Sequence, residues 1–357
     1  MSWGGFETRF EGWPRGAALA VIVALIALLA LACWSPAASP APKVRTTAAQ
    51  HSDLQLYRDI ITCVRAGEGY YSATADELRK GNYPLKPFFT FRLPTHATIY
   101  AALGERAMVV IFWLLSAALM IAWWIRLRSS LPRLLLAAAL ILLAGGLGGL
   151  LQPQTGLFHE SWAALLLALM IAIHRPERFW PAVLAGGAAL MVRELALPMI
   201  LAMAGLALLE RRWREVAAWT AVVALFAVFL VLHARWVGQV VLTGDPPSQG
   251  WSSMLGLQFA LKSIAKVTFG IRLPAALASA ALILSLFGWV SVRTGWGLRV
   301  AILLAGYGAM LALLARTDTF YWALIAAPLS FAGLVFVPKA LSDLLKSLRT
   351  SREGVLT

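Results

Sequence analysis

The feature that most constrains this chain is a series of apolar runs separated by short charged clusters. Several runs reach about 20 residues, the length that crosses a bilayer as an α-helix. A helix suits that environment because it satisfies its backbone polar groups internally. Only 13% of the residues are charged, and they lie between the runs, which argues against a soluble globular domain. The sequence therefore predicts an all-α polytopic membrane protein.

The net charge of +14 also fits a membrane protein better than a nucleic-acid-binding one. The basic residues form short clusters between apolar runs, as the positive-inside rule predicts for cytoplasmic loops. Many of the 15 Trp residues lie near the ends of runs, where indole rings favour the membrane interface. We expect no nucleic-acid partner, and we expect a multi-pass protein of the bacterial inner (plasma) membrane with both termini in the cytoplasm.

The apolar runs predict about ten transmembrane helices in one integral-membrane domain, 1–357. If the run 179–209 were one helix, every later basic cluster would change sides, so we predict a break at Arg193 and Glu194. Four glycines between positions 145 and 149 indicate close helix packing. The predicted spans are 16–34, 106–125, 134–151, 161–173, 179–192, a sixth ending at 209, 216–235, 271–292, 298–315 and 320–337.

Three polar segments lie outside these spans. We predict that 35–105 is a large first extracytoplasmic loop carrying juxtamembrane helices and that 236–270 is a second extracytoplasmic loop. The segment 339–357 is a basic, amphipathic cytoplasmic tail. Ala30 lies three residues before Cys33 and fits a lipoprotein cleavage site poorly, so we expect the first span to remain as an anchor.

The first loop contains the stretch HSDLQLYRDIITCVRAGEGYY, residues 51–71. From Asp53 onward, apolar residues recur every three or four positions, which predicts a helix with one face against a membrane surface or another helix. A carboxylate beside that face is unfavourable unless it is paired or used. Two interpretations stay open: Ser52 or Asp53 caps the helix, or Asp53 performs chemistry, and one Asp can do both.

The predicted topology places the remaining polar residues on the same outer face, where carboxylates and basic groups fit an anionic lipid head group. Sugar transfer from a lipid phosphate needs a base for the acceptor hydroxyl and positive charge for the departing phosphate. Asp53 is the candidate catalytic base, and Arg193 is the candidate phosphate ligand, assisted by Lys266 or Arg272. The candidate substrate-binding residues are Tyr57, His159, Glu160, Arg193, Glu194, Lys262, Lys266, Arg272 and Arg316.

These groups also have structural explanations. Closely spaced polar residues can pair with one another, cap a helix, form a plain turn or contact lipid head groups. The pairs open to such explanations are Arg193–Glu194, His159–Glu160, Lys262–Lys266 and Arg316–Asp318. The sequence contains no glycine-rich phosphate loop after a strand, no HEXXH motif and no Cys/His ligand spacing, so it predicts neither a nucleotide-binding fold nor a zinc site.

Four short motifs carry a resemblance to a known family: DLQLY at 53–57, GEGYY at 67–71, NYPL at 82–85 and the pair Arg193–Glu194. The chain resembles the GT-C superfamily of integral-membrane glycosyltransferases, in its polyprenyl-phosphate mannosyltransferase-like branch (glycosyltransferase family 87 and relatives). The resemblance implies transfer of a sugar, with inversion, from a polyprenyl-phosphate donor to a lipid or glycan acceptor of the cell envelope. Asp53 matches the family's catalytic acidic residue. A single Asp stands where the family has a paired acidic motif, which leaves a divalent metal requirement open.

Two other classes of function remain as alternatives. A transporter for lipid-linked envelope precursors would use the same basic cavity without chemistry, although the sequence shows no convincing internal repeat of the kind common in transporters. A scaffold subunit of an envelope-polymer machine is favoured if Asp53 is only a helix cap.

Overall fold

The computed structural model of the chain describes residues 6–34 and 53–349, and all of its named elements in these ranges are helices. The elements are α-helices joined by short 3-10 helices, and no named β-strand occurs in the described residues. Ser52, one of the two candidate helix caps, lies outside the described ranges. The prediction of an all-α protein is confirmed.

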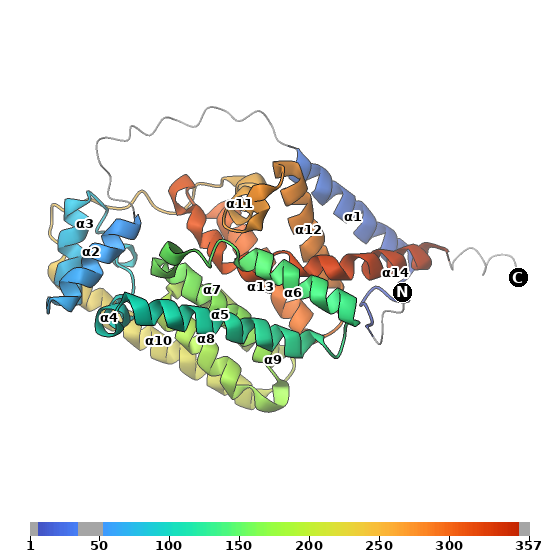
Figure 1. The fold of residues 1–357 in the computed structure, drawn as a ribbon, viewed down its shortest axis with the longest axis horizontal. Coiled ribbons are helices and arrows are strands. Elements are labelled where there is room, and N and C mark those ends of the chain that lie inside the picture. The colour runs from blue at the N-terminus through green and yellow to red at the C-terminus, as the bar shows by residue number, and fades with distance from the viewer. Residues whose placement is uncertain (1–5, 35–52, 350–357) are drawn as a thin grey trace, which may run out of the picture.

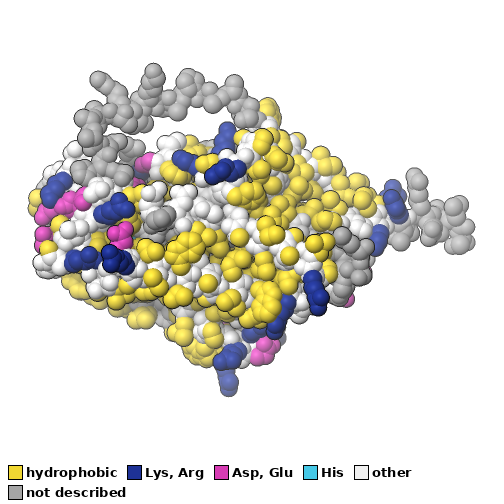
Figure 2. Space-filling model, in the orientation of Figure 1, with side chains coloured by type: hydrophobic (Ala, Val, Ile, Leu, Met, Phe, Trp, Pro, Cys, Tyr) yellow, Lys and Arg dark blue, Asp and Glu magenta, His cyan; other side chains and the backbone are white. Residues whose placement is uncertain are grey.

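Five helical stretches are long and apolar enough to cross a membrane. They are α1 (Arg15–Cys33), α5 (Glu105–Leu127), α10 (Trp213–Val240), α13 (Gly295–Leu313) and Ala327–Arg349. Five shorter apolar helices accompany them: α6 (Arg133–Leu147), α7 (His159–Ile173), α8 (Trp180–Val192), the stretch Glu194–Leu209 and α12 (Ala275–Ser291). Hydrophobic side chains cover the middle of the face seen in Figure 2, with charged side chains toward its ends. These features indicate a membrane protein, and the number of ten crossings stays a prediction.

The predicted break at Arg193 is confirmed. Arg193 is extended, with φ −148° and ψ 118°, and it separates α8 from the 3-10 helix η4 (Glu194–Ala196) and α9 (Leu197–Leu209). Pro198 lies in the first turn of α9, where its missing N–H leaves no hydrogen bond unmade. The break brings an arginine and a glutamate to the end of a short helix rather than to the middle of a long one.

The predicted tenth span, 320–337, is helical but is not one continuous α-helix. This segment forms three 3-10 helices, η6 (Thr317–Ile325), η7 (Ala327–Leu329) and η8 (Ala332–Phe336), followed by α14 (Val337–Arg349). Pro328 lies at the start of η7, and a Cβ added at Gly333 would lie 2.1 Å from the Ser285 carbonyl oxygen of α12. Irregular backbone of this kind is tolerated at membrane depth only where protein buries it, and this segment is almost entirely buried. Helix α14 covers the described part of the predicted tail 339–357; residues 350–357 lie outside the described ranges, and the cytoplasmic placement of the tail stays a prediction.

Glycines allow close packing in this part of the fold, as predicted. A Cβ on Gly146 of α6 would lie 2.4 Å from the Ala327 carbonyl oxygen. On Gly149 it would lie 2.0 Å from the Val267 carbonyl oxygen. The neighbours that approach so closely are irregular backbone, not the regular helix faces that the glycine pattern suggested.

The beginning and the end of the described chain pack together. Helix α1 packs mainly against α12 and α14. Ahead of α1, the Thr8 hydroxyl donates to the buried Asp343 carboxylate of α14 at 2.7 Å, and Arg9 N–H donates to the Ser291 carbonyl at the end of α12. The first and last elements of the chain therefore share one interface.

The two ends of the molecule differ in architecture. Figure 1 shows α2 (Asp53–Arg65), α3 (Tyr70–Lys80) and α4 (Pro94–Leu103) together at one end and α14 toward the opposite end. The predicted helix from Asp53 is confirmed as α2, and its buried residues Leu56, Tyr57, Ile60 and Ile61 belong to the apolar face read from the sequence. That face packs against α3 and α4 and roofs the cavity described next.

Candidate active site

A cavity of about 330 Å³ lies between the cap of α2, α3 and α4 and the ends of the apolar helices beneath it. Its wall combines apolar side chains of α2 with charged and aromatic groups contributed by segments far apart in the sequence. Most of the predicted site residues line it: Asp53, Tyr57, His159, Arg193, Glu194 and Arg316. The break after α8 and the 3-10 geometry of η6 are what bring the last three to the same wall.

Asp53, the first residue of α2, is held by a tyrosine from the following loop. The Tyr83 hydroxyl donates to Asp53 Oδ1 at 2.9 Å. Burial and then the Asp53 carboxylate raise the pKa of Tyr83 well above its ordinary value, so the phenol keeps its proton and remains a donor. The carboxylate is half-buried and keeps access to the cavity.

Arg92 is a cationic group in the cavity that sequence reasoning missed. Its guanidinium donates to the hydroxyls of Tyr57 (3.3 Å) and Tyr321 (3.0 Å), and the Tyr70 hydroxyl donates to its carbonyl oxygen at 2.7 Å. Burial lowers the pKa of Arg92, but Tyr57 and Tyr321, with the more distant carboxylates of Glu160 and Glu194, outweigh burial and raise the pKa overall. The side chain therefore stays charged. No carboxylate in the described chain lies within ion-pair distance of it. The only sequence signal was a lone arginine between aromatic residues and a proline, at 88–94.

Arg193 lines the cavity but is paired with two carboxylates. Its side chain is 1% exposed, it forms an ion pair with the fully buried Glu160 at 2.8 Å, and it contacts Glu194 directly. Removing one partner of such a buried pair leaves an uncompensated charge, which is strongly destabilising. The geometry thus matches the structural explanation of Arg193 and Glu194, and it places Glu160 behind the wall of the cavity rather than in it.

Arg316 closes the side of the cavity near the second predicted loop. It forms a two-pronged pair with Asp318, at 3.0 and 2.8 Å, and its Nη1 also donates to Ser248 at 3.3 Å. Ser248 and Trp251 line the same wall. Arg316 therefore joins η6 to the loop that follows α10.

Three predicted basic residues lie outside the cavity. Lys262 and Lys266 are exposed on α11 (Gly256–Lys266), and Arg272 is exposed at the end of the next 3-10 helix, η5 (Phe269–Arg272). The Lys266 ammonium lies 3.6 Å from the centre of the Phe320 ring. Helix α11 buries its apolar face, including Ala260 and Ile264, and neither lysine lines the cavity.

Two buried histidines complete the inner wall. His159 was predicted, whereas His96 of α4 was not, because a single histidine in a mixed segment gives no pattern. Their rings lie 4.3 Å apart between centres, and the His159 ring also packs edge-on against Tyr57. Among the described residues, no group of three or more His, Cys, Asp or Glu side chains is placed to hold a metal ion.

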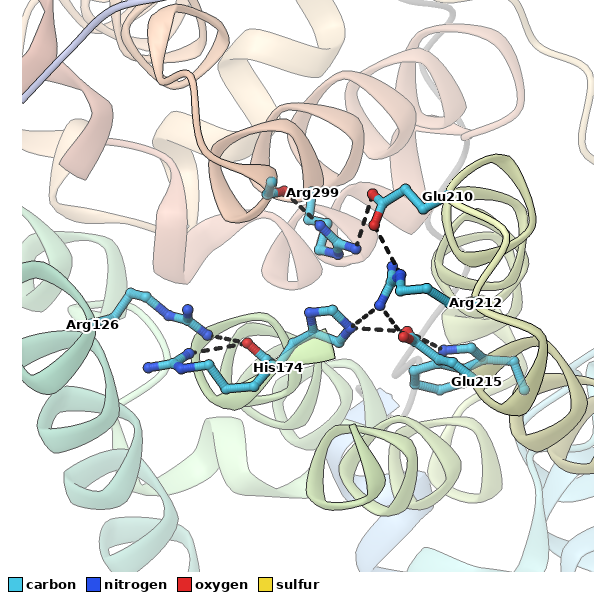
Figure 3. A network of polar contacts seen from close by, with 9 residues as sticks. Arg126, His174, Glu210, Arg212, Glu215 and Arg299 are labelled. Carbon is cyan, nitrogen blue, oxygen red and sulfur yellow. Dashed lines mark hydrogen bonds and ion pairs between the residues drawn. The ribbon is translucent and has the colours of Figure 1, made fainter. Parts of the chain in front are cut away.

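A second polar cluster lies at the other ends of the same helices (Figure 3). His174, just after α7, pairs with Glu215 of α10 at 2.9 Å, and Arg212 contacts Glu215 and pairs with Glu210 at 2.9 Å. Arg299 of α13 approaches Glu210 at 3.7 Å. These contacts join the turns after α7 and α9 to α13. The cavity is thus at one end of the bundle and an ion-pair network is at the other.

Comparison of the chain with protein-family models, with curated proteins and with solved structures finds no match.

Proposed function

We propose that this protein is a membrane glycosyltransferase of the GT-C type that moves a sugar from a polyprenyl-phosphate donor to an envelope lipid or glycan on the extracytoplasmic face. The observation that carries the proposal is the sharing of one cavity by the carboxylate of Asp53 and the guanidinium of Arg92, which has no carboxylate partner in the described chain. The apolar residues Leu56, Ile60 and Ile61 line the same cavity and suit the first isoprene units of the donor.

In this mechanism Asp53 accepts the proton of the acceptor hydroxyl as its oxygen attacks the anomeric carbon of the sugar. A new carbon–oxygen bond forms to the acceptor, the bond from the anomeric carbon to the phosphate oxygen breaks, and the electron pair leaves with polyprenyl phosphate. Attack from the face opposite the phosphate inverts the anomeric configuration. The products are the glycosylated acceptor, polyprenyl phosphate and protonated Asp53, which water then deprotonates.

We assign the departing phosphate to Arg92 rather than to Arg193. A guanidinium that donates only to neutral hydroxyls keeps its full charge for an anionic ligand, and charge-assisted pairing with phosphate is strong. Arg193 is already balanced by Glu160 and Glu194 and serves to hold the wall of the cavity. Arg316, balanced by Asp318, holds the side wall.

The test compares Asp53→Asn with Asp59→Asn in protein reconstituted in lipid with a panel of radiolabelled polyprenyl-phosphate sugars and envelope acceptors. Asp59 lies on the same helix and binds Gln55 at 2.7 Å, outside the cavity. We expect Asp53→Asn to lower release of polyprenyl phosphate by roughly 10²- to 10⁴-fold, the range for loss of a general base, with unchanged elution in size-exclusion chromatography. Asp59→Asn keeps wild-type turnover.

Other outcomes point elsewhere. Wild-type rates in Asp53→Asn would remove this residue from the mechanism. Binding of donor by both wild type and variant, with turnover by neither in the presence of acceptor, would favour the transporter or scaffold alternative.

A further inference from the structure

The two histidines of the inner wall have unsatisfied hydrogen-bonding groups. His159 is 2% exposed, and neither of its ring nitrogens has a hydrogen-bond partner in the described structure. His96 is equally buried, and its Nδ1 likewise has no partner there. Buried polar groups of proteins are nearly always paired, and leaving one unpaired is costly. Since both rings line the cavity, a ligand in the cavity can supply the missing partners, which it cannot do for the Nε2 of His233, outside the cavity and also without a partner among the described residues.

The protonation of His96 follows from its surroundings. Its Nε2 lies 3.3 Å from the Gly156 carbonyl oxygen, which only accepts, so Nε2 carries the proton and Nδ1 is left as an acceptor. Tyr100 and Trp162 donate to the same carbonyl, at 3.0 and 2.7 Å, which fixes that oxygen in place. Burial lowers the pKa of His96 to about 4, so the ring is neutral at physiological pH.

The position of His159 selects the class of group it can bind. Its ring is held between His96 and Tyr57, at 4.3 and 5.2 Å between ring centres. Tyr57 in turn accepts from Arg92, so the histidines lie beside the proposed phosphate ligand. A neutral imidazole offers one donor and one acceptor. That combination matches hydroxyl groups, which both donate and accept.

We propose that His96 and His159 form a subsite that binds hydroxyl groups of the donor sugar and sets which sugar is accepted. This inference rests on the proposed function, because it takes the ligand beside Arg92 to be a lipid-linked sugar. The phosphate then contacts Arg92, and the sugar ring extends toward the histidines.

The test measures affinity for polyprenyl phosphate with and without a sugar, using protein in lipid nanodiscs. Wild type is expected to bind one of the glycosylated lipids about tenfold more tightly than bare polyprenyl phosphate, the effect of one or two added hydrogen bonds. His159→Phe keeps a flat ring and removes both nitrogens, so we expect this preference to disappear while affinity for bare polyprenyl phosphate is unchanged. The matched control is His233→Phe, at a buried histidine of α10 outside the cavity, which keeps the preference.

Two results would overturn the inference: equal wild-type affinity for all the glycosylated and bare lipids, or a His159→Phe protein that retains the preference. If His159→Phe does not fold, His159→Gln replaces it, with one donor and one acceptor on a flexible side chain. We expect this variant to lose selectivity between sugars and analogues lacking one hydroxyl. Turnover is measured separately. If wild type prefers a glycosylated lipid and His159→Phe does not, but wild type transfers no sugar, the proposed enzyme is rejected and the sugar subsite is retained.

Discussion

Asp53 depends on a contact that its own helix cannot provide. Its carboxylate accepts the Tyr83 hydroxyl, and Tyr83 belongs to the loop after α3. Asn82, just before it, has φ of 55°, a left-handed conformation that asparagine adopts more readily than most residues. The turn therefore directs the phenol back toward α2. At the scale of single residues, the proposed base is held by a donor from NYPL, one of the motifs that carry the family resemblance.

Replacing Tyr83 with Phe removes this donor and leaves the ring. We expect the rate of sugar transfer to fall by roughly tenfold, because a hydrogen bond to a charged group both stabilises and orients it. The measurement is single-turnover release of polyprenyl phosphate with saturating donor. Tyr71→Phe is the control, since its hydroxyl contacts His233 at 3.1 Å, outside the cavity. A Tyr83→Phe protein as fast as the control would separate Tyr83 from catalysis.

At the scale of elements, one ion pair fixes the second predicted loop on the cap. Arg79 of α3 binds both oxygens of Asp245, at 2.9 and 2.8 Å, and also donates to the Val240 carbonyl at the end of α10. The Leu242 N–H donates to the same carboxylate at 2.7 Å. The loop fixed in this way supplies Ser248 and Trp251 to the cavity.

This pair makes the loop sensitive to acid. Arg79 and then the Leu242 N–H lower the pKa of Asp245 from 3.8 to about 2, so the folded state favours the ionised carboxylate. The stabilisation is fully present above about pH 4 and is lost as the pH falls toward 2. We expect amide hydrogen-exchange protection of residues 241–251, corrected for intrinsic rates, to fall by roughly tenfold between about pH 4 and pH 2. A larger loss is not expected, because the Arg79 side chain is partly exposed and solvent screens the ion pair.

Asp245→Asn should show the same loss of protection at neutral pH and little further change in acid. Asp76→Asn is the matched control, because Asp76 contacts Arg79 at 3.2 Å but is largely exposed. If Asp245→Asn retained wild-type protection at pH 7, the pair would not be what holds the loop.

Patterns in the sequence were sufficient for some elements and not for others. The period of three and four residues identified α2, and two charges in an apolar run identified the break after α8. The segment 317–336 has the composition of a span, but it contacts α12 and α6 closely and forms 3-10 helices. Such tertiary contacts cannot be predicted from composition. In the cavity, Arg92 and His96 were missed because only tertiary packing brings them beside Asp53.

At the scale of the whole molecule, two polar regions occupy opposite ends of an apolar bundle. The cavity and its cap lie at one end, and the network of His174, Glu210, Arg212, Glu215 and Arg299 lies at the other (Figures 1 and 3). Two further arginines, Arg175 and Arg178, lie in the turn after α7 with one carboxylate, Glu177, between them. By the positive-inside rule we predict that this end faces the cytoplasm and that the cavity faces the outside.

Labelling of introduced cysteines tests this orientation. In a background with Cys33→Ser and Cys63→Ser, we expect a membrane-impermeant maleimide added to spheroplasts to label Asp76→Cys on α3 and not Glu177→Cys in the turn after α7. Both positions are exposed in the folded chain. Glu177→Cys is labelled only after lysis. Labelling of Glu177→Cys but not Asp76→Cys in intact spheroplasts would reverse the topology, and with it the face on which the proposed reaction occurs.

The interface between α1 and the pair α12 and α14 has a consequence for how the protein is made. Helix α1 can meet these neighbours only after synthesis of the chain has reached α12 and α14. Until then the Thr8 hydroxyl has no Asp343 to bind. A chain truncated before α12 would therefore leave α1 without these partners, and we expect membrane quality control to recognise it.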